Sequence, residues 1–222
     1  MKDQIRIVAT KKLSEKQKQQ LLNADFSVIE EDFINVQSKD FEIKNVSDCL
    51  IFTSQNAVES VLKNKKIAQL KTKKCFCVGE NTRLLLIEND FEVLAHADYA
   101  AELASIICNQ YSKISFTFFC GNMRRNFLPD ALRLARVKLE EIEVYETMLT
   151  PHKIDLEPDG ILFFSPSGVK SYLQENKIEN ENCFCIGNTT AEALREITPN
   201  RIIANQPTIE SVVIRCIEHY KN

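Results

Sequence analysis

The chain repeats itself: segments of its first half recur, in the same order, about 110 residues later. The clearest matches are LIFTSQNAVESVL (50–62) with ILFFSPSGVKSYL (161–173), and KCFCVGENT (74–82) with NCFCIGNTT (182–190). More loosely, residues 114–145 match residues 5–34. One copy is therefore continuous, whereas the other begins near residue 160 and is completed by the start of the chain. This wrap-around predicts two related lobes, one inserted into the other.

Each copy alternates short apolar runs with amphipathic stretches, the pattern that builds parallel sheets from right-handed βαβ units. The expected strands are 5–9, 26–30, 50–53, 75–78, 91–94, 115–119, 139–144, 160–164, 183–186 and 201–204. The expected helices include 55–63, 80–88, 99–110, 124–136, 166–175, 188–197 and 207–220. The predicted fold class is therefore α/β, with two parallel-sheet domains of the flavodoxin-like or Rossmann-like kind.

The repeat also predicts the domain boundaries. An outer, discontinuous domain takes residues 1–34 and 150–222, and an inserted domain takes residues 40–144. Two linkers, near 32–40 and 145–152, carry the chain between them. A total of 222 residues gives each lobe about 110 residues, which is an ordinary domain size.

Composition limits the classes of partner. The net charge is −3, whereas nucleic-acid binders are usually basic, so no nucleic-acid partner is expected. The N-terminus lacks the apolar core of a signal peptide, and no apolar run reaches the ~18 residues of a spanning helix. We therefore expect a cytoplasmic protein without a membrane partner, and a monomer by default.

The chain has eight cysteines, and the pattern CFC occurs at 75–77 and again at 183–185. Alternate residues of a strand share one face, so each CFC is expected to place two small buried thiols on one side of a sheet and phenylalanine on the other. Structural zinc sites favour C-x2-C or longer spacings, and the chain has only three histidines. No metal site is predicted.

Glycines mark the expected functional surface. Four of the five glycines (Gly79, Gly121, Gly168 and Gly187) fall where a strand gives way to a helix. In parallel sheets, ligands bind beyond these carboxyl ends, where helix N–H groups point outward and favour anions. The turns are rich in hydroxyl and amide side chains, which are also good helix caps, so capping is an alternative at each turn. Arg124 and Arg125 can add a bidentate contact to a carboxylate.

No established phosphate loop, Ser-His-Asp pattern or turn histidine accompanies these glycines. Two classes of function fit what remains. One is an enzyme acting on an acidic small molecule, and the other is a two-lobed binding or effector-sensing module without catalysis. The absence of a signal peptide disfavours a periplasmic binding protein, and the absence of a helix-turn-helix segment before the first strand disfavours a repressor.

Several segments resemble the uroporphyrinogen-III synthase family in order and spacing. They are FTSQNAVESVL, CFCVGENT, FFCGNMRRNFLPDAL followed by VYET, FFSPSGVKSYL, CFCIGNTTAEAL and NQPTIES. The resemblance covers nearly the whole chain. It implies two α/β lobes, one of them interrupted, joined by a two-stranded linker across an open cleft. It also implies a lyase of haem and porphyrin biosynthesis that needs no cofactor.

The implied reaction converts linear hydroxymethylbilane, which carries eight carboxylates, to uroporphyrinogen III with loss of water and inversion of ring D. The usual scheme forms an azafulvene on ring A and a spiro intermediate on ring D. By resemblance, the tyrosine of VYET, Tyr145, is the catalytic residue, since a phenol stays protonated at neutral pH. The implied substrate-binding residues are Lys11, Thr53, Ser54, Asn81, Thr82, Gly121, Asn122, Arg124, Ser165, Ser167, Gly168, Gly187, Thr189 and Thr190.

Two departures from the family pattern stand out. Many bacterial relatives have T-R-P after the first strand, whereas this chain has Thr10-Lys11-Lys12, and lysine lacks the planar fork of arginine. A glycine common at helix ends in the family is missing from LARVKL and LLNADF. Because these are helix C-cap positions, we expect the change to affect stability rather than function.

Overall fold

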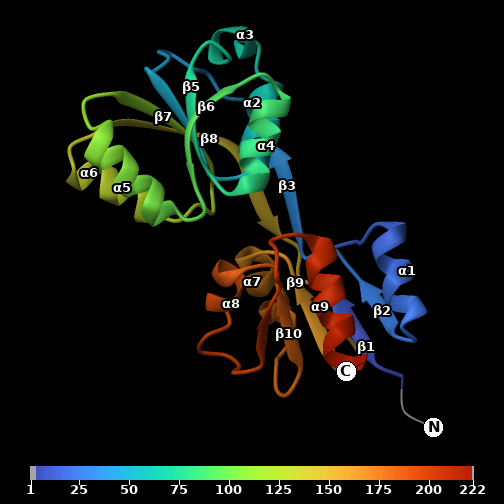
Figure 1. The fold of residues 1–222 in the computed structure, drawn as a ribbon. Helices are drawn as coiled ribbons and strands as arrows, with labels where there is room; N and C mark the ends of the chain where they lie inside the picture. Colours follow the sequence, from blue (N-terminus) through green and yellow to red (C-terminus); the bar gives the residue numbers. More distant parts are fainter. Residues whose placement is uncertain (1–3, 222) are drawn as a thin grey trace. The chain divides into compact units, whose positions relative to one another are not determined.

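The computed structural model describes residues 4–221, and the chain divides into two compact units. One, here called the inserted unit, is Val36–Thr147. The other, the outer unit, combines the chain up to Asn35 with the chain from Met148 onward. Both are α/β units built on parallel sheets, as predicted (Figure 1). Among the described residues, no helix has the length and apolar character that crossing a membrane requires.

The inserted unit contains a six-stranded sheet in the order β3-β8-β7-β4-β5-β6. The strands are β3 (Ile34–Ser38), β4 (Cys49–Phe52), β5 (Lys74–Val78), β6 (Glu92–Ala97), β7 (Ser115–Gly121) and β8 (Lys138–Leu149). The neighbouring strands β8, β7, β4, β5 and β6 are all paired in parallel. The edge strand β3 and the long strand β8 are neighbours in the sheet and include both points where the chain changes unit, so the predicted two-stranded linker is present.

Helices cover both faces of this sheet (Figure 1). On one face, α2 (Gln55–Leu62), α3 (Ile67–Leu70) and α4 (Glu80–Glu88) bury their apolar residues. On the other, α5 (Ala100–Gln110) and α6 (Phe127–Leu134) do the same. Because both faces are covered, a central strand has no polar side, and all four residues of β4 (CLIF) are buried.

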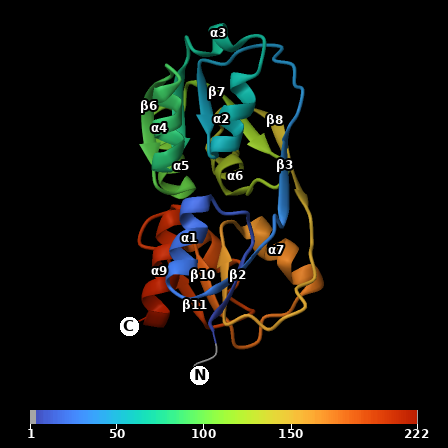
Figure 2. The same ribbon diagram turned by 90° about the vertical axis from the view of Figure 1, so that its right-hand side faces the viewer.

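The outer unit has a five-stranded parallel sheet in the order β11-β10-β9-β1-β2. The strands are β1 (Arg6–Ala9), β2 (Ser27–Glu30), β9 (Gly160–Phe163), β10 (Asn182–Cys185) and β11 (Arg201–Ile203). Helices α1 (Glu15–Asn23) and α9 (Ile209–Lys221) lie side by side on one face (Figure 2), and α7 (Pro166–Glu175) and α8 (Asn188–Glu192) cover the other.

The two sheets have the same strand order once the outer unit is read from β9 through the C-terminus and back to β1. In each, the first strand of the copy lies at the centre, beside the second on one side and the fourth on the other. The strand order therefore reverses between β4 and β7, and between β9 and β1. Such a reversal opens a crevice beyond the carboxyl ends of the two strands, where ligands bind in doubly wound sheets.

The CFC pattern behaves as predicted. Cys75 and Cys77 pack in the core under α2 and α4, whereas Phe76 packs in the opposite core. In the outer unit, Cys183 and Cys185 of β10 likewise pack in one core, under α7 and α8. Phe184 packs in the opposite core. All eight cysteines are free thiols, and seven of them are buried.

The missing glycines coincide with strained helix ends. Asp25 in LLNADF and Arg136 in LARVKL both have a φ of 58°, in the left-handed region that usually favours glycine, and Asp90 after α4 shares this conformation with a φ of 60°. After each, an apolar residue donates its N–H back across the helix end, as Phe26 does to Leu21 and Val137 to Leu132. The bond and the apolar contact together hold a backbone conformation that glycine would adopt without steric cost.

Several helices differ from expectation, among them the short α3 (Ile67–Leu70), which was not expected. The expected helix 124–136 spans only Phe127–Leu134, because Arg124 and its neighbours form a turn after β7. The expected helix 188–197 ends as an α-helix at Glu192, and the chain continues in tighter turns with bonds to the third residue back, such as Leu194 N to Ala191 O. Helix α1 was not among the expected helices, although Ser14 and Gln17 form a capping box that marks its start.

Candidate active site

Predicted site residues of the inserted unit gather where its strand order reverses. Thr53 and Ser54 follow β4, while Gly121 ends β7 and Asn122 follows it. Ser54 caps α2 and accepts a hydrogen bond from the Asn56 N–H at 3.1 Å. The capping alternative therefore holds at this turn, but a hydroxyl that accepts in this way keeps its own proton for donation.

Tyr145 reaches the same place from β8 through a shift in register. Cys120 is opposite Glu143, but the next residue, Gly121, is opposite Tyr145, so Val144 is passed over. An extra residue of this kind re-aims the side chains around it. As a result, Val144 and Tyr145 both pack against the core under α2 and α4, although successive residues of a regular strand would face opposite sides.

The Tyr145 ring is half-buried at the end of β7. Loss of solvent on burial raises the pKa of its phenol, and a hydrogen bond with the Ser54 side chain lowers it. The larger effect is burial, so the phenol keeps its proton well above neutral pH. The same hydrogen bond links the hydroxyl of Tyr145 to the turn that follows β4.

Asn122 and Arg124 already have partners within the inserted unit. The Asn122 amide pairs in both directions with the backbone of Thr147, at 3.2 Å and 2.9 Å. The guanidinium of Arg124 forms an ion pair with Glu141, which also pairs with Arg133. A cavity of about 390 Å³ next to Gly121 is lined by Asn122, Arg124 and Glu141, with Cys120, Asn126 and Glu143. In this arrangement the charge of Arg124 is balanced internally.

Another predicted turn of the inserted unit opens α4. Gly79 begins this helix with a φ of 86°, which an L side chain rarely adopts, and supplies no side-chain cap. Asn81 is half-buried, and Thr82 is only 5% exposed. The Thr82 side chain therefore belongs to the packed start of α4 rather than to an open surface.

The outer unit repeats the first of these turns. Ser165 caps α7 and accepts from the Gly168 N–H at 3.0 Å, and its hydroxyl lies 3.0 Å from that of Ser167. A β-carbon on Gly168 would lie 3.3 Å from the Ser165 hydroxyl and 3.5 Å from the hydroxyl of Thr10. Thr10 itself donates to Leu162 O at 2.8 Å, so the ends of β1 and β9 are tied together.

The remaining predicted residues of the outer unit differ in exposure. Lys11, the second residue after β1, is exposed, as is Thr189 in the first turn of α8. Gly187 starts α8 without a side-chain cap, and no atom lies within 4 Å of where its β-carbon would be. Thr190 is 2% exposed and is part of the packed helix start, like Thr82 in the inserted unit.

Three residues at these turns were not predicted from the sequence: Thr10, Glu141 and Thr147. Thr10 is followed by two lysines, and their charge is the stronger signal for an acidic ligand. Glu141 sits in the acidic run LEEIE, where nothing marks one carboxylate as the partner of Arg124. Thr147 takes part through its backbone, which the identity of a side chain cannot reveal.

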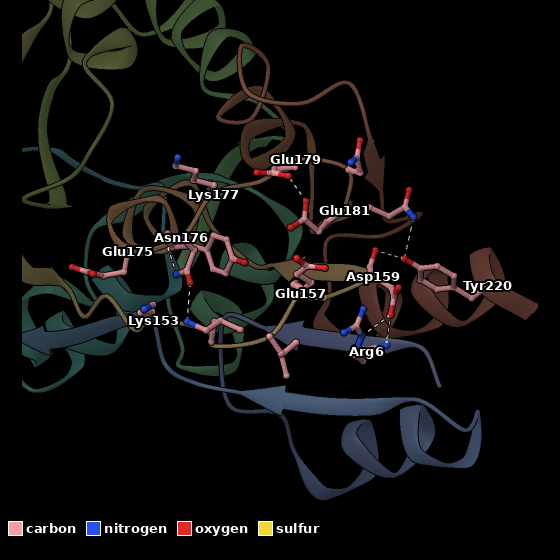
Figure 3. A pocket seen from close by; sticks show the side chains of 16 residues that line it. Arg6, Lys153, Glu157, Asp159, Glu175, Asn176, Lys177, Glu179, Glu181 and Tyr220 are labelled. Atoms are coloured by element: carbon pink, nitrogen blue, oxygen red, sulfur yellow. Dashed lines mark hydrogen bonds and ion pairs between the residues drawn. The ribbon is translucent and has the colours of Figure 1, made fainter. Parts of the chain in front are cut away.

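A larger cavity, of about 700 Å³, lies at the opposite edge of the outer sheet. Its lining includes Arg6 and Asn182, the first residues of β1 and β10. Figure 3 shows Arg6 and Tyr220 directed at Asp159, to which both donate hydrogen bonds. None of the predicted site residues lines this cavity. It is therefore separate from the turns that follow β1 and β9.

Within residues 4–221, no group of three or more His, Cys, Asp or Glu side chains is arranged to hold a metal ion. The charged groups around the inserted-unit turns are instead paired with one another, and Tyr145 is the only phenol among the predicted site residues. The chemistry that this arrangement offers is hydrogen-bond donation and proton transfer by a hydroxyl.

The fold has close counterparts among solved structures. The uroporphyrinogen-III synthetase of Helicobacter pylori 26695 superposes with a TM-score of 0.71 at 22% identity, over 97% of this chain and 99% of that chain. A mutant uroporphyrinogen III synthase from the extremely thermophilic bacterium Thermus thermophilus gives a TM-score of 0.71 at 13% identity, over 98% and 100%. At such identities these structures bear on the fold alone.

The sequence itself supplies the assignment. The family model described as uroporphyrinogen-III synthase HemD matches residues 15–214 of this chain, from the first residue of α1 into α9. The match therefore includes both linkers and the strand reversal between β4 and β7. Of the reversal between β9 and β1, it includes β9 but not the end of β1. This chain belongs to the uroporphyrinogen-III synthase family.

Proposed function

We propose that this chain cyclises linear hydroxymethylbilane to uroporphyrinogen III, with loss of water and inversion of ring D. The observation that carries the proposal is the family match over residues 15–214. A binding module without catalysis is not favoured, because the match covers the site turns of an enzyme family. The family also implies a small tetrapyrrole substrate. A monomer in the cytoplasm remains part of the proposal.

In the proposed mechanism, Tyr145 acts as the general acid. Its phenol donates a proton to the hydroxyl leaving ring A, which departs as water, and the later closure at ring D releases the proton that restores the phenol. Two features support this role. The phenol is kept protonated by burial, and its hydroxyl shares a hydrogen bond with the Ser54 side chain at the turn after β4. Proton donation of this kind contributes about 10²–10⁴-fold to rate.

The substrate carboxylates are proposed to bind at turns of both units. In the inserted unit these turns begin α2 and α4, with Thr53, Ser54 and Asn81 as donors. In the outer unit they follow β1, β9 and β10, with Lys11, Ser165, Ser167 and Thr189 as donors. Helix starts at Gly79 and Gly187 have no side-chain cap, so backbone N–H groups there can receive carboxylates without displacing one.

The direct test supplies freshly made hydroxymethylbilane and identifies the cyclic isomer by chromatography. The expected product is isomer III, formed faster than spontaneous closure. Formation of isomer I alone, at the rate seen in buffer, would contradict the proposal. The product is informative because spontaneous closure yields the other isomer, so orientation by the protein is what the assay measures.

The role of Tyr145 is tested with Tyr145→Phe, which removes only the hydroxyl. We expect turnover to fall by about 10²-fold. Tyr111→Phe is the matched control, because Tyr111 packs edge-on against Phe76 in the opposite core, with ring centroids 5.0 Å apart. Its removal should leave turnover unchanged. If Tyr145→Phe reacts at the wild-type rate, Tyr145 is not the acid.

A further inference from the structure

Asn122 uses its side chain as if it were one more residue of β7. Its Nδ2 donates to the carbonyl oxygen of Thr147 at 3.2 Å, and the N–H of Thr147 donates to Oδ1 at 2.9 Å. Both backbone groups of Thr147 are therefore paired by one primary amide. That is the pairing a neighbouring peptide makes in a sheet, although β7 has already ended at Gly121.

The place of this pairing is significant. The register of β7 and β8 shifts between Cys120 and Gly121, and Val144 is left without a partner. A shift of this kind disrupts the ladder locally. Regular pairing fixes β8 on one side of the shift, and the Asn122 amide fixes it on the other, two residues beyond Tyr145. The irregular segment is held at both ends.

The shift decides where the Tyr145 ring lies. With the pairing continued unshifted from Cys120 and Glu143, Val144 would be opposite Gly121, and Tyr145 would point to the other face. In the observed register, Tyr145 is opposite Gly121, and its ring covers the glycine closely enough to exclude a β-carbon there. Slippage of one residue would therefore remove the phenol from this position.

We propose that Asn122 is a positioning residue for the reaction: its amide locks the shifted register of β8 and thereby holds the Tyr145 ring over Gly121. The inference rests on the proposed function, because it assigns the tyrosine a role in that reaction. It replaces the sequence-based interpretation of Asn122 as a ligand of the substrate.

The kinetic test combines Asn122→Ala, Tyr145→Phe and the double variant, each with hydroxymethylbilane. We expect Asn122→Ala to lower kcat by about 10-fold and to change KM by less than about 2-fold. The double variant should be no slower than Tyr145→Phe, since the amide acts through the phenol. A raised KM with unchanged kcat, or losses that multiply in the double variant, would overturn the proposal.

Two further variants control for the loss of an amide. Asn109→Ala removes an exposed asparagine of α5 that bonds Ser105, and it should leave kcat unchanged. Asn122→Asp keeps an acceptor for the Thr147 N–H but loses the donor, so its kcat should lie between those of the wild type and Asn122→Ala. If Asn122→Ala does not fold, Asn122→Asp is compared with the wild type in its place.

A spectroscopic readout needs no substrate. The protein is labelled at tyrosine Cζ, and the Tyr145 resonance is identified by its loss in Tyr145→Phe. Burial raises the pKa of Tyr145, so release of the ring in Asn122→Ala should return that pKa toward the ordinary value of about 10. If the wild type makes no isomer III but the Tyr145 pKa differs between Asn122→Ala and the wild type, the proposed function fails. The positioning of Tyr145 by Asn122 then still stands. If the wild type is active and the titration is unchanged, the positioning role is refuted.

Discussion

Tyr145 occupies the space that a side chain on Gly121 would fill. A β-carbon built on Gly121 would lie 2.4 Å from Cε2 and Cζ of the ring and 2.9 Å from its oxygen. The same two residues are opposite each other in the β7–β8 register. The phenol of Tyr145 can therefore lie here only because residue 121 is glycine.

Gly121→Ala should displace the Tyr145 ring. We expect kcat to fall by at least about 10-fold, because small displacements of catalytic groups have large effects, and the free energy of unfolding to fall by about 1–3 kcal/mol from overpacking. Urea unfolding of Gly187→Ala is the control for stability. Nothing lies within 4 Å of that position, so its unfolding free energy should change by less than about 0.5 kcal/mol. Wild-type kcat and stability in Gly121→Ala would refute the steric argument.

Glu141→Gln tests whether Arg124 is held back from the substrate. The two side chains are 18% and 25% exposed and form an ion pair. Removal of the carboxylate charge should free Arg124 to bind a substrate carboxylate, so we expect KM to fall by about 3-fold. The comparison is Glu140→Gln, an equal loss of charge at an exposed position of β8. An unchanged KM would show that Arg124 serves only the structure of the turn.

Thiol reactivity should single out Cys108, the one cysteine that is not buried. With a thiol-reactive chromogenic disulfide, the native protein should show about one fast-reacting thiol, and the denatured protein all eight. Cys108→Ser should abolish the fast phase. More than one fast thiol in the native protein would contradict the burial of the CFC strands.

Alkaline pH should weaken the fold through the buried thiols. Burial raises the pKa of Cys183 and of Cys185 to about 12, whereas an unfolded thiol ionises at about 8.5. The stability that the two neutral thiols contribute is fully present below the pKa of the unfolded thiol. It is lost as the pH rises toward the pKa of the thiols in the folded protein. Each thiol should lower the free energy of unfolding by about 1.4 kcal/mol per pH unit in that window.

Urea unfolding under reducing conditions at pH 8 and pH 10 measures this loss. A Cys183→Ala, Cys185→Ala variant should depend less on pH than the wild type does. An equal pH dependence in the two proteins would show that the thiols of β10 are not its source.

Arg136→Gly should stabilise the protein. Arg136 follows α6 with a φ of 58°, a conformation that costs a residue with a β-carbon about 1 kcal/mol. We expect a gain of that order in the free energy of unfolding. Ala135→Gly introduces the same residue one position earlier, where φ is −78°, and should have the opposite sign. Equal effects of the two substitutions would rule out relief of backbone strain.

Features that repeat or alternate could be predicted from the sequence. The repeat predicted two parallel sheets, and the strand order shows them to be equivalent. The alternation in CFC predicted which side chains share a face, because the geometry of a strand imposes it. Ser54 and Ser165 were expected at helix starts, and both are caps.

Features that depend on register or on a choice among equal partners could not be predicted. Nothing in VYET shows that Val144 is passed over and that Tyr145 turns to the same core. Nothing in LEEIE shows that Glu141 is the partner of Arg124. The burial of Thr82 and Thr190 likewise depends on how each helix start packs. Single-residue offsets of this kind arise from packing, which a local pattern does not contain.

The wrap-around of the outer unit also sets an order of events during translation. Strand β1 leaves the ribosome early, but its neighbour β9 begins only at Gly160. The inserted unit has all its own strands by Leu149. In a nascent chain the inserted unit can therefore fold first, while the sheet of the outer unit still lacks its central strand, β9.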